Sequence, residues 1–363
     1  EKLVGIAPEG LGKAVFQNSG SEAVDTAMKF IWYYHNAIGK PEKKKIIARE
    51  NAYHGTGIAS ASLTGLARMH MAFDLPVTDR VLRTDCPHFF KYGEDGETEE
   101  AFSTRCANNL EQLILDECPD TVAAFFAEPV MGAGGVIVPA ATYFEKVQAV
   151  LKKYDVLMVA DEVICGFGRT GNMWGSQTFN IKPDLLTCAK ALSSSYLPIS
   201  AVLISDDLYT AVRDQSGELG GFSHGYTYSG HPVPAAVALE TLKIYEERDI
   251  VGHVQRVGPI MQARLREFSD HPLVGEVRGV GLLAGVEVMA DGANRLSFDP
   301  AAKVGPKVQA LCEENGLLIR AMGDSIGFCP PLIIDEATIE KMLAQFDKSL
   351  DQALDWARQE GLV

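Results

Sequence analysis

The sequence predicts an α/β protein in two parts: a large domain at residues 1–249, with a mostly parallel central sheet covered by helices, and a small C-terminal α+β domain at residues 250–363. Continuous apolar runs of strand length, at 121–127 and 156–160, are typical of parallel strands buried on both faces. Segments with helical spacing of apolar residues separate these runs, as in strand–helix–strand units. Near residue 250 the pattern changes to short strands between longer helices, which indicates a second unit.

The expected elements follow in chain order. The run Ala14-Val-Phe-Gln17 leads into a helix beginning at Ser19, because Ser19 and Glu22 have capping-box spacing and apolar residues follow at helical intervals. Strands of the large domain are expected at 46–51, 121–127, 156–160, 184–189 and 199–204, helices at 99–117, 142–154 and from Pro232 through Tyr245, and a surface loop at 82–98. The small domain is expected to have helices at 251–269, 301–315 and 336–359, and strands at 274–278, 282–288, 317–321 and 326–329.

Composition excludes several classes of function. The formal net charge of -15 argues against a general nucleic-acid binder, which needs a basic surface. The seven cysteines are scattered without a Cys-x-x-Cys pair, and the eight histidines show no zinc-binding spacing, so we expect free thiols and no metal site. No apolar run is long enough to span a membrane, and the first residues do not resemble a signal peptide. We therefore expect a cytoplasmic protein with no membrane partner.

Two charged residues follow predicted strands and are the candidate catalytic pair. The run at 156–160 ends on Asp161, and the run at 184–189 ends on Lys190. Because ligands bind at the carboxyl ends of strands in α/β sheets, both side chains should reach one crevice. An imine-forming lysine and a counter-charge for a ring nitrogen suit pyridoxal phosphate. On its own, a lysine after a buried strand is more often a solvated loop residue than a catalytic one.

A rival function for this strand end is nucleotide hydrolysis. An apolar strand ending in Asp161-Glu162 also resembles the magnesium-binding carboxylate of P-loop NTPases. That reading requires a Gly-x-x-x-x-Gly-Lys-Ser/Thr motif, which the chain lacks.

Three further stretches could contribute to the same site. The helix start at Ser19, Gly20 and Ser21 presents free backbone N–H groups to an anion such as phosphate, although an ordinary capped helix has the same pattern. The triplet Tyr53-His54-Gly55 could offer a flat face to a ring ligand. Glu128 is a third carboxylate at a strand end.

Together these motifs resemble the class III pyridoxal-phosphate aminotransferases in order and approximate spacing over nearly the whole chain. The motifs are Asn18-Ser-Gly-Ser-Glu22, Tyr53-His-Gly55, Glu128-Pro129, Asp161-Glu-Val163, Ala189-Lys190 and Gly225-Tyr-Thr227-Tyr-Ser-Gly-His-Pro232. The segments at 191–201 and 320–332 resemble most the omega-transaminases, or amine:pyruvate aminotransferases. The resemblance implies a fold type I transferase with pyridoxal 5'-phosphate.

The resemblance also implies roles for individual residues. The residues expected to bind the cofactor are Ser19, Gly20, Ser21, Tyr53, His54, Glu128, Asp161, Val163, Lys190 and Thr227. Lys190 would hold it as an imine, Asp161 would pair with its ring nitrogen, and Tyr53 and Val163 would cover the two ring faces. Gly20 and Ser21 would hold the phosphate, joined by Thr227 of a neighbouring subunit. Arg320 would swing in to bind a substrate carboxylate.

The expected substrates are an amine donor and a keto-acid acceptor such as pyruvate, and the expected assembly is a homodimer with shared active sites, or a tetramer of such dimers. A taurine, beta-alanine, putrescine or diaminopelargonate aminotransferase, and a non-catalytic protein of the same fold, remain alternatives. This sequence reaches Asn18 sooner than the family does, so we expect the family's N-terminal segment to be missing.

Overall fold

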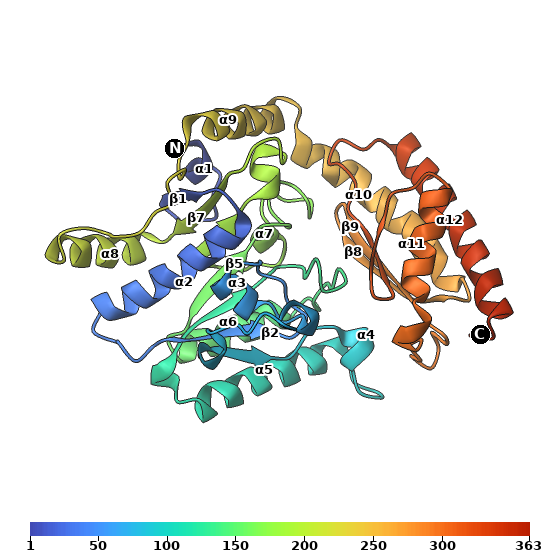
Figure 1. Cartoon of the computed structure of the whole chain (residues 1–363), viewed down its shortest axis with the longest axis horizontal. Coiled ribbons are helices and arrows are strands. Elements are labelled where there is room, and N and C mark those ends of the chain that lie inside the picture. The colour runs from blue at the N-terminus through green and yellow to red at the C-terminus, as the bar shows by residue number, and fades with distance from the viewer.

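A seven-stranded mixed sheet forms the centre of the larger part of the molecule, in a computed structural model that describes all residues 1–363 (Figure 1). Its strands are β1 (Lys13–Gln17), β2 (Lys45–Arg49), β3 (Val81–Thr84), β4 (Val122–Ala127), β5 (Leu157–Asp161), β6 (Leu185–Cys188) and β7 (Ser200–Ile204), in the order β1-β7-β6-β5-β4-β2-β3. Neighbours from β3 to β6 are parallel, whereas β7 is antiparallel to both β6 and β1. The predicted mostly parallel sheet is therefore confirmed.

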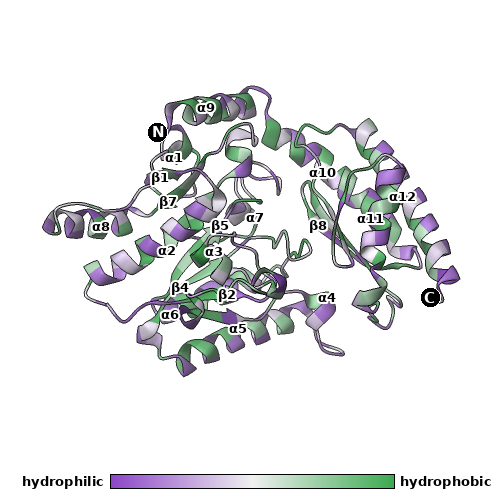
Figure 2. Ribbon diagram, viewed as in Figure 1, coloured by the Kyte–Doolittle hydropathy of each residue, from purple (hydrophilic) through white to green (hydrophobic).

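Helices cover both faces of this sheet, so its central strands are apolar on both sides. All six residues of β4 are buried, and Figure 2 shows the apolar centre of the molecule against helices that have one polar side. One face carries α2 (Gly20–Ala37), α3 (Ile58–Leu63) and α8 (Asp206–Glu218). The other carries α5 (Glu99–Asp116) and α6 (Tyr143–Lys153). Three shorter helices are α1 (Lys2–Gly5), α4 (Phe89–Tyr92) and α7 (Gly175–Thr178).

A second, antiparallel sheet forms the centre of the C-terminal part. Its four strands, β8 (Val274–Val280), β9 (Leu283–Val288), β10 (Arg320–Met322) and β11 (Ser325–Phe328), lie in the order β10-β11-β9-β8. The helices α10 (Ile250–Arg266), α11 (Val304–Glu314) and α12 (Glu336–Gln359) pack with it around a common core. Figure 1 shows this sheet between α11 and α12 and the larger part of the molecule, with α9 (Pro232–Glu247) leading into α10. None of the helices is long and apolar enough to cross a lipid bilayer.

Several elements of the larger part were not predicted from the sequence: the short helices α1, α3, α4 and α7, strand β3 and helix α8. The expected loop at 82–98 is wrong at its start, because β3 occupies Val81–Thr84 and pairs with β2. None of the four residues of β3 is fully buried, so this edge strand has no apolar run to reveal it. Helix α8 was not expected, and only Leu208 and Val212 of its thirteen residues are buried.

Candidate active site

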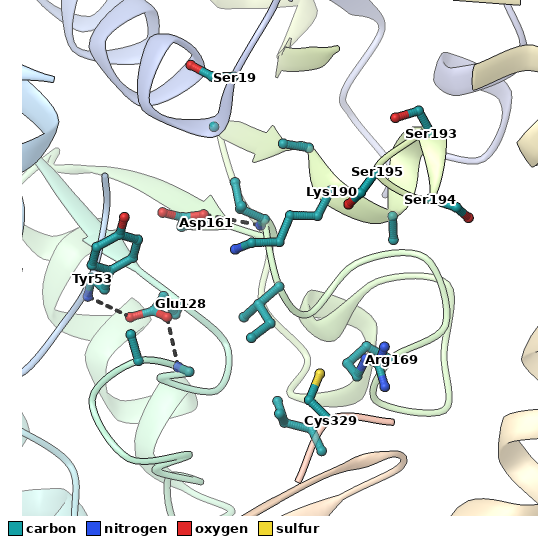
Figure 3. Close-up of a pocket in the computed structure, with 18 of the residues that line it drawn as sticks. Ser19, Tyr53, Glu128, Asp161, Arg169, Lys190, Ser193, Ser194, Ser195 and Cys329 are labelled. Atoms are coloured by element: carbon teal, nitrogen blue, oxygen red, sulfur yellow. Dashed lines mark hydrogen bonds between the residues drawn. The ribbon is translucent and has the colours of Figure 1, made fainter. Parts of the chain in front are cut away.

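Asp161 and Lys190 lie at the carboxyl ends of two neighbouring parallel strands. Asp161 is the last residue of β5 and lies opposite Thr187 of β6. Lys190 follows Thr187 by three positions in the chain. Lys190 begins a short 3-10 helix and has a φ of +41°, a left-handed conformation that a lysine rarely adopts and that is often found at functional sites. Both residues line one cavity of about 1550 Å³. Figure 3 shows the Lys190 side chain extending toward the side of the cavity that holds Asp161 and Tyr53.

The Asp161 carboxylate is buried and held by two hydrogen bonds. His54 Nδ1 lies 2.8 Å from Oδ2, and the Val163 backbone N–H donates to Oδ1 at 3.2 Å. The His54 ring is itself buried, packs edge-on against Phe126, and leaves its Nε2 without a partner. His54 was expected among the cofactor-binding residues; here it lines the cavity and its bond fixes the orientation of Asp161.

Glu128 holds the backbone of two segments that border the cavity. Its Oε1 accepts from the Tyr53 N–H at 3.0 Å and its Oε2 from the Gly132 N–H at 2.9 Å (Figure 3). Burial raises the pKa of the Glu128 carboxyl. Arg49 donates to the backbone oxygen of Glu128, at 2.5 Å, and not to its carboxylate.

The first turn of α2 borders another side of the cavity and presents free backbone N–H groups there. Ser19 is the N-cap and accepts from the Glu22 N–H at 3.2 Å, while Glu22 accepts from the Asn18 N–H at 2.8 Å. A Cβ on Gly20 would lie 3.1 Å from Val163, and a Cβ on Gly55 would lie 2.6 Å from Ser21 Oγ. Glycine at these two positions leaves room beside the free N–H groups of the helix, where an anion is favoured.

The structure brings nine of the ten expected cofactor-binding residues to this cavity, and Arg320 as well. Its lining includes Ser19, Gly20, Ser21, Tyr53, His54, Glu128, Asp161, Val163, Lys190 and Arg320. Tyr53 and Val163 are half-buried, and Arg320 is exposed at the start of β10. Thr227 is exposed and is not part of the lining.

The sequence reasoning missed several cavity residues, among them Arg169 and Cys329 (Figure 3). Arg169 is half-buried, and its Nη1 donates to Leu282 O at 2.9 Å and to Pro330 O at 2.6 Å, across to the C-terminal part. These acceptors are more than a hundred residues away in the chain, so only the folded structure reveals the contact. No cluster of three or more His, Cys, Asp or Glu side chains is arranged to hold a metal ion.

Comparison with known proteins places this geometry in a family. The sequence model of the family "Aminotransferase class-III" matches residues 1–350. The chain is 57% identical to the chloroplastic gamma aminobutyrate transaminase 3 of Solanum lycopersicum over 340 residues, which are 94% of this chain and 65% of that protein. It is 53% identical to the mitochondrial gamma-aminobutyrate transaminase 1 of Oryza sativa subsp. indica, covering 94% of this chain and 66% of that protein. The chain thus spans slightly less than two thirds of the length of these curated relatives.

Solved structures show the same fold. A transaminase with L-alanine superposes with a TM-score of 0.96 at 57% identity, covering 98% of this chain and 83% of that one. An omega transaminase from Pseudomonas jessenii in complex with PMP has a TM-score of 0.96 at 51% identity, covering 98% and 78%. The predicted fold type I is confirmed, and pyridoxal phosphate, the predicted cofactor, is the cofactor of this family. The residues of the cavity fit this cofactor, because Lys190 and the hydrogen-bonded Asp161 carboxylate share it with the free N–H groups at the N-terminus of α2.

One expectation is wrong. The chain was expected to be cytoplasmic, but the relatives from Solanum lycopersicum and Oryza sativa are named chloroplastic or mitochondrial. All seven cysteines are free, and free thiols argue only against an oxidising compartment, so they do not separate the cytosol from other reducing compartments. The family resemblance, in contrast, is confirmed by the match over residues 1–350 and by both solved structures. The chain belongs to the class III aminotransferases, a family of pyridoxal-phosphate-dependent enzymes.

Proposed function

We propose that this chain is a transaminase that moves an amino group from an omega-amino compound, of the gamma-aminobutyrate type, or from a primary amine, to a keto acid such as pyruvate. The observation that supports it most is the meeting of Asp161 and Lys190 at one cavity, beside the bare first turn of α2. When bound, pyridoxal phosphate supplies a ring that takes up the electron pair released at the substrate carbon.

We propose that three groups of residues bind the cofactor and transfer the proton. The Lys190 amine holds the cofactor and then carries a proton from the substrate carbon, which general bases do with a rate gain of about 10²- to 10⁴-fold. Asp161, fixed by His54, offers a carboxylate oxygen to the ring nitrogen and keeps that nitrogen protonated. Ser19, Gly20 and Ser21 bind the phosphate at the positive end of the α2 dipole.

Arg320 is proposed to bind the carboxylate of the keto acid or amino acid. It is exposed on β10 and lines the cavity, so its guanidinium has room to turn toward or away from a substrate. Arg320→Gln should raise KM for pyruvate by at least about tenfold, because a charge-assisted pair contributes about 1.5–3 kcal/mol. KM for an amine that lacks a carboxylate should change less than twofold. Equal changes for both substrates would argue against this role.

The decisive test of the function uses the purified protein with the cofactor. An absorbance band that borohydride removes, with the cofactor then found on the peptide containing Lys190, is the expected result. Lys190→Ala should lower kcat by at least about 100-fold. Lys182→Ala changes an exposed lysine before β6 and serves as the control, with unchanged kcat expected. A Lys190→Ala variant as active as the parent would show that the chemistry lies elsewhere.

A half-reaction screen tests the choice of substrate. Each amine is added alone to the cofactor-loaded protein, and the loss of the coloured form is followed with time. Gamma-aminobutyrate should react fastest if the proposal is right. Faster reaction with taurine, beta-alanine, putrescine or diaminopelargonate would assign the chain to that alternative, and reaction with none of them would favour a non-catalytic protein of this fold.

We also propose a homodimer with shared active sites. Four large apolar side chains between the end of α8 and the middle of α9 are exposed: Leu219, Tyr228, Val233 and Leu239. Exposed apolar residues concentrated along one stretch of chain are consistent with a protein interface. Thr227 lies within this segment, which supports a role in the site of the second copy. Leu239→Asp should give a monomer in sedimentation and weaken cofactor binding, and a monomeric parent protein would refute the proposal.

The domain division is proposed at residues 249 and 250. All strands of the seven-stranded sheet precede Asp249, and all strands of the four-stranded sheet follow it. Asp249 has a φ of +46° and caps α10 by accepting from the Gly252 N–H at 3.2 Å. Limited proteolysis should cut near this junction when the cofactor is removed, and cleavage only elsewhere would contradict the boundary.

A further inference from the structure

Arg278 of β8 reaches out of the C-terminal part and contacts a backbone loop of the larger part. Its side chain is almost fully buried. Nε lies 3.1 Å from the Gly135 carbonyl oxygen and 3.0 Å from that of Val136, and Nη2 also donates to Gly135 O. Gly135 and Val136 belong to the loop that follows β4 and Glu128.

The guanidinium charge is balanced within the C-terminal sheet. Nη1 lies 2.6 Å from a Glu276 carboxylate oxygen and Nη2 lies 2.7 Å from one of Glu287. Ser325 Oγ accepts from Nη2 at 3.0 Å, and His88 Nε2 of the larger part lies 2.7 Å from the same Glu276 oxygen. A buried charge with two carboxylate partners is fixed in place, so the atoms that face the loop are fixed as well.

Hydrogen bonds within the loop connect the Arg278 contact to Glu128, which lines the cavity. Met131 and Ile137 exchange backbone hydrogen bonds of 3.0 and 2.9 Å, which close the loop into a compact unit. Within it, the Gly132 N–H donates to Glu128 Oε2, and the other oxygen of Glu128 accepts from the Tyr53 N–H (Figure 3). A Cβ on Gly135, whose φ is +121°, would lie 2.9 Å from Ser325 Oγ. The contact between loop and sheet therefore depends on this glycine.

We propose that Arg278 is a positioning residue for the cofactor site: by binding the Gly135 and Val136 carbonyls it fixes the loop that orients Glu128, and through Glu128 it places Tyr53 against the cofactor ring. This inference rests on the proposed function, because Tyr53 is taken to stack on the ring. Arg278 lines no part of the cavity, and its action passes through Glu128.

The test compares cofactor binding and stability in Arg278→Lys. Lysine keeps the charge beside Glu276 and Glu287 but lacks the planar fork that reaches both carbonyls. The affinity for pyridoxal phosphate should fall roughly 2- to 30-fold, the range typical of coupling between linked sites. The melting temperature is measured with and without cofactor, because a purely structural role lowers both values equally, whereas a positioning role also reduces the gain on cofactor binding.

Two further variants locate the effect. Arg264→Gln is the matched control, because Arg264 pairs with Glu340 entirely within the C-terminal part; its cofactor affinity should equal that of the parent. Glu128→Gln removes one of the two carboxylate acceptors, so adding Arg278→Lys to it should cost less affinity than Arg278→Lys alone. If Arg278→Lys does not fold, Ser325→Ala replaces it, with a smaller loss of affinity expected.

The outcomes separate this inference from the proposed function. A parent protein that binds no pyridoxal phosphate refutes the function. A parent that binds it, together with an Arg278→Lys or Ser325→Ala variant of unchanged affinity, refutes the role of Arg278 alone. Full additivity of Arg278→Lys and Glu128→Gln also overturns it, since the two residues would then act independently.

Discussion

Replacing His54 by phenylalanine tests whether this histidine orients Asp161. The phenyl ring has a similar shape and keeps the edge-on contact with Phe126, where the ring centroids are 5.9 Å apart. It removes the donor 2.8 Å from Asp161 Oδ2 and leaves that buried oxygen without a partner. Asp161 then keeps only the hydrogen bond from the Val163 N–H.

The expected loss of stability follows from these contacts. A hydrogen bond to a charged group contributes about 1.5–3 kcal/mol, and loss of the unpartnered His54 Nε2 returns about 1 kcal/mol. The free energy of unfolding should therefore fall by about 0.5 to 2 kcal/mol. Urea denaturation of the cofactor-free protein measures it, as a lower midpoint at unchanged slope.

Cofactor binding supplies the second measurement. A carboxylate free to turn should pair less well with the ring nitrogen, so His54→Phe should also bind pyridoxal phosphate more weakly. His54→Asn places an amide nitrogen near the position of Nδ1 and should recover part of that affinity, although it loses ring packing. A His54→Phe protein within about 0.5 kcal/mol of the parent, with unchanged affinity, would refute the reasoning, since surface changes have effects of that size.

Two other predictions concern stability. Burial raises the pKa of Glu162 from its ordinary value of 4.5 to about 7, so between these values the folded state keeps a proton that the unfolded chain has released. The free energy of unfolding should therefore fall as pH rises through this window, by up to about 1.4 kcal/mol per pH unit from this group. Glu162→Gln should flatten the decline in urea midpoints measured from pH 4.5 to 7. The same decline in the variant and the parent would contradict the prediction. Gly305→Ala should destabilise by about 1–3 kcal/mol, because its Cβ would lie 2.0 Å from the Gly323 carbonyl oxygen, in the turn that follows Arg320. Gly217→Ala, in α8 with nothing within 4 Å, should stabilise by roughly 0.5 kcal/mol, and thermal melts that rank the two variants the other way would disprove the steric argument.

The central sheet could be predicted because its strands are short apolar runs between amphipathic helices. β4, with all six residues buried, is a clear case. The antiparallel direction of β7 has no such local signal, since its five buried residues would read the same in either direction. β3 and α8 were missed because their few buried side chains give them no distinct pattern.

The site could be predicted in part for a similar reason. Asp161 and Lys190 each follow a buried strand, and neighbouring parallel strands end at one edge, so their meeting follows from local patterns. The bond from His54 to Asp161 joins residues 107 positions apart, and the bond from Arg278 to Gly135 joins residues 143 apart. No spacing in the sequence encodes such contacts: the first depends on how the loop after β2 lies over β5, and the second on how the two sheets are placed.

The edge position of β1 has a consequence for the order of assembly during translation. β1 has one neighbour in the sheet, β7, and its pairs run from Lys13 with Ile204 to Gln17 with Ser200. A nascent chain must therefore be synthesised past residue 204 before β1 can pair with β7. Helix α2 follows β1 directly, so its first turn gains a fixed place only at that stage. The proposed phosphate-binding turn, Ser19 to Ser21, therefore depends on a strand that is synthesised about 180 residues later.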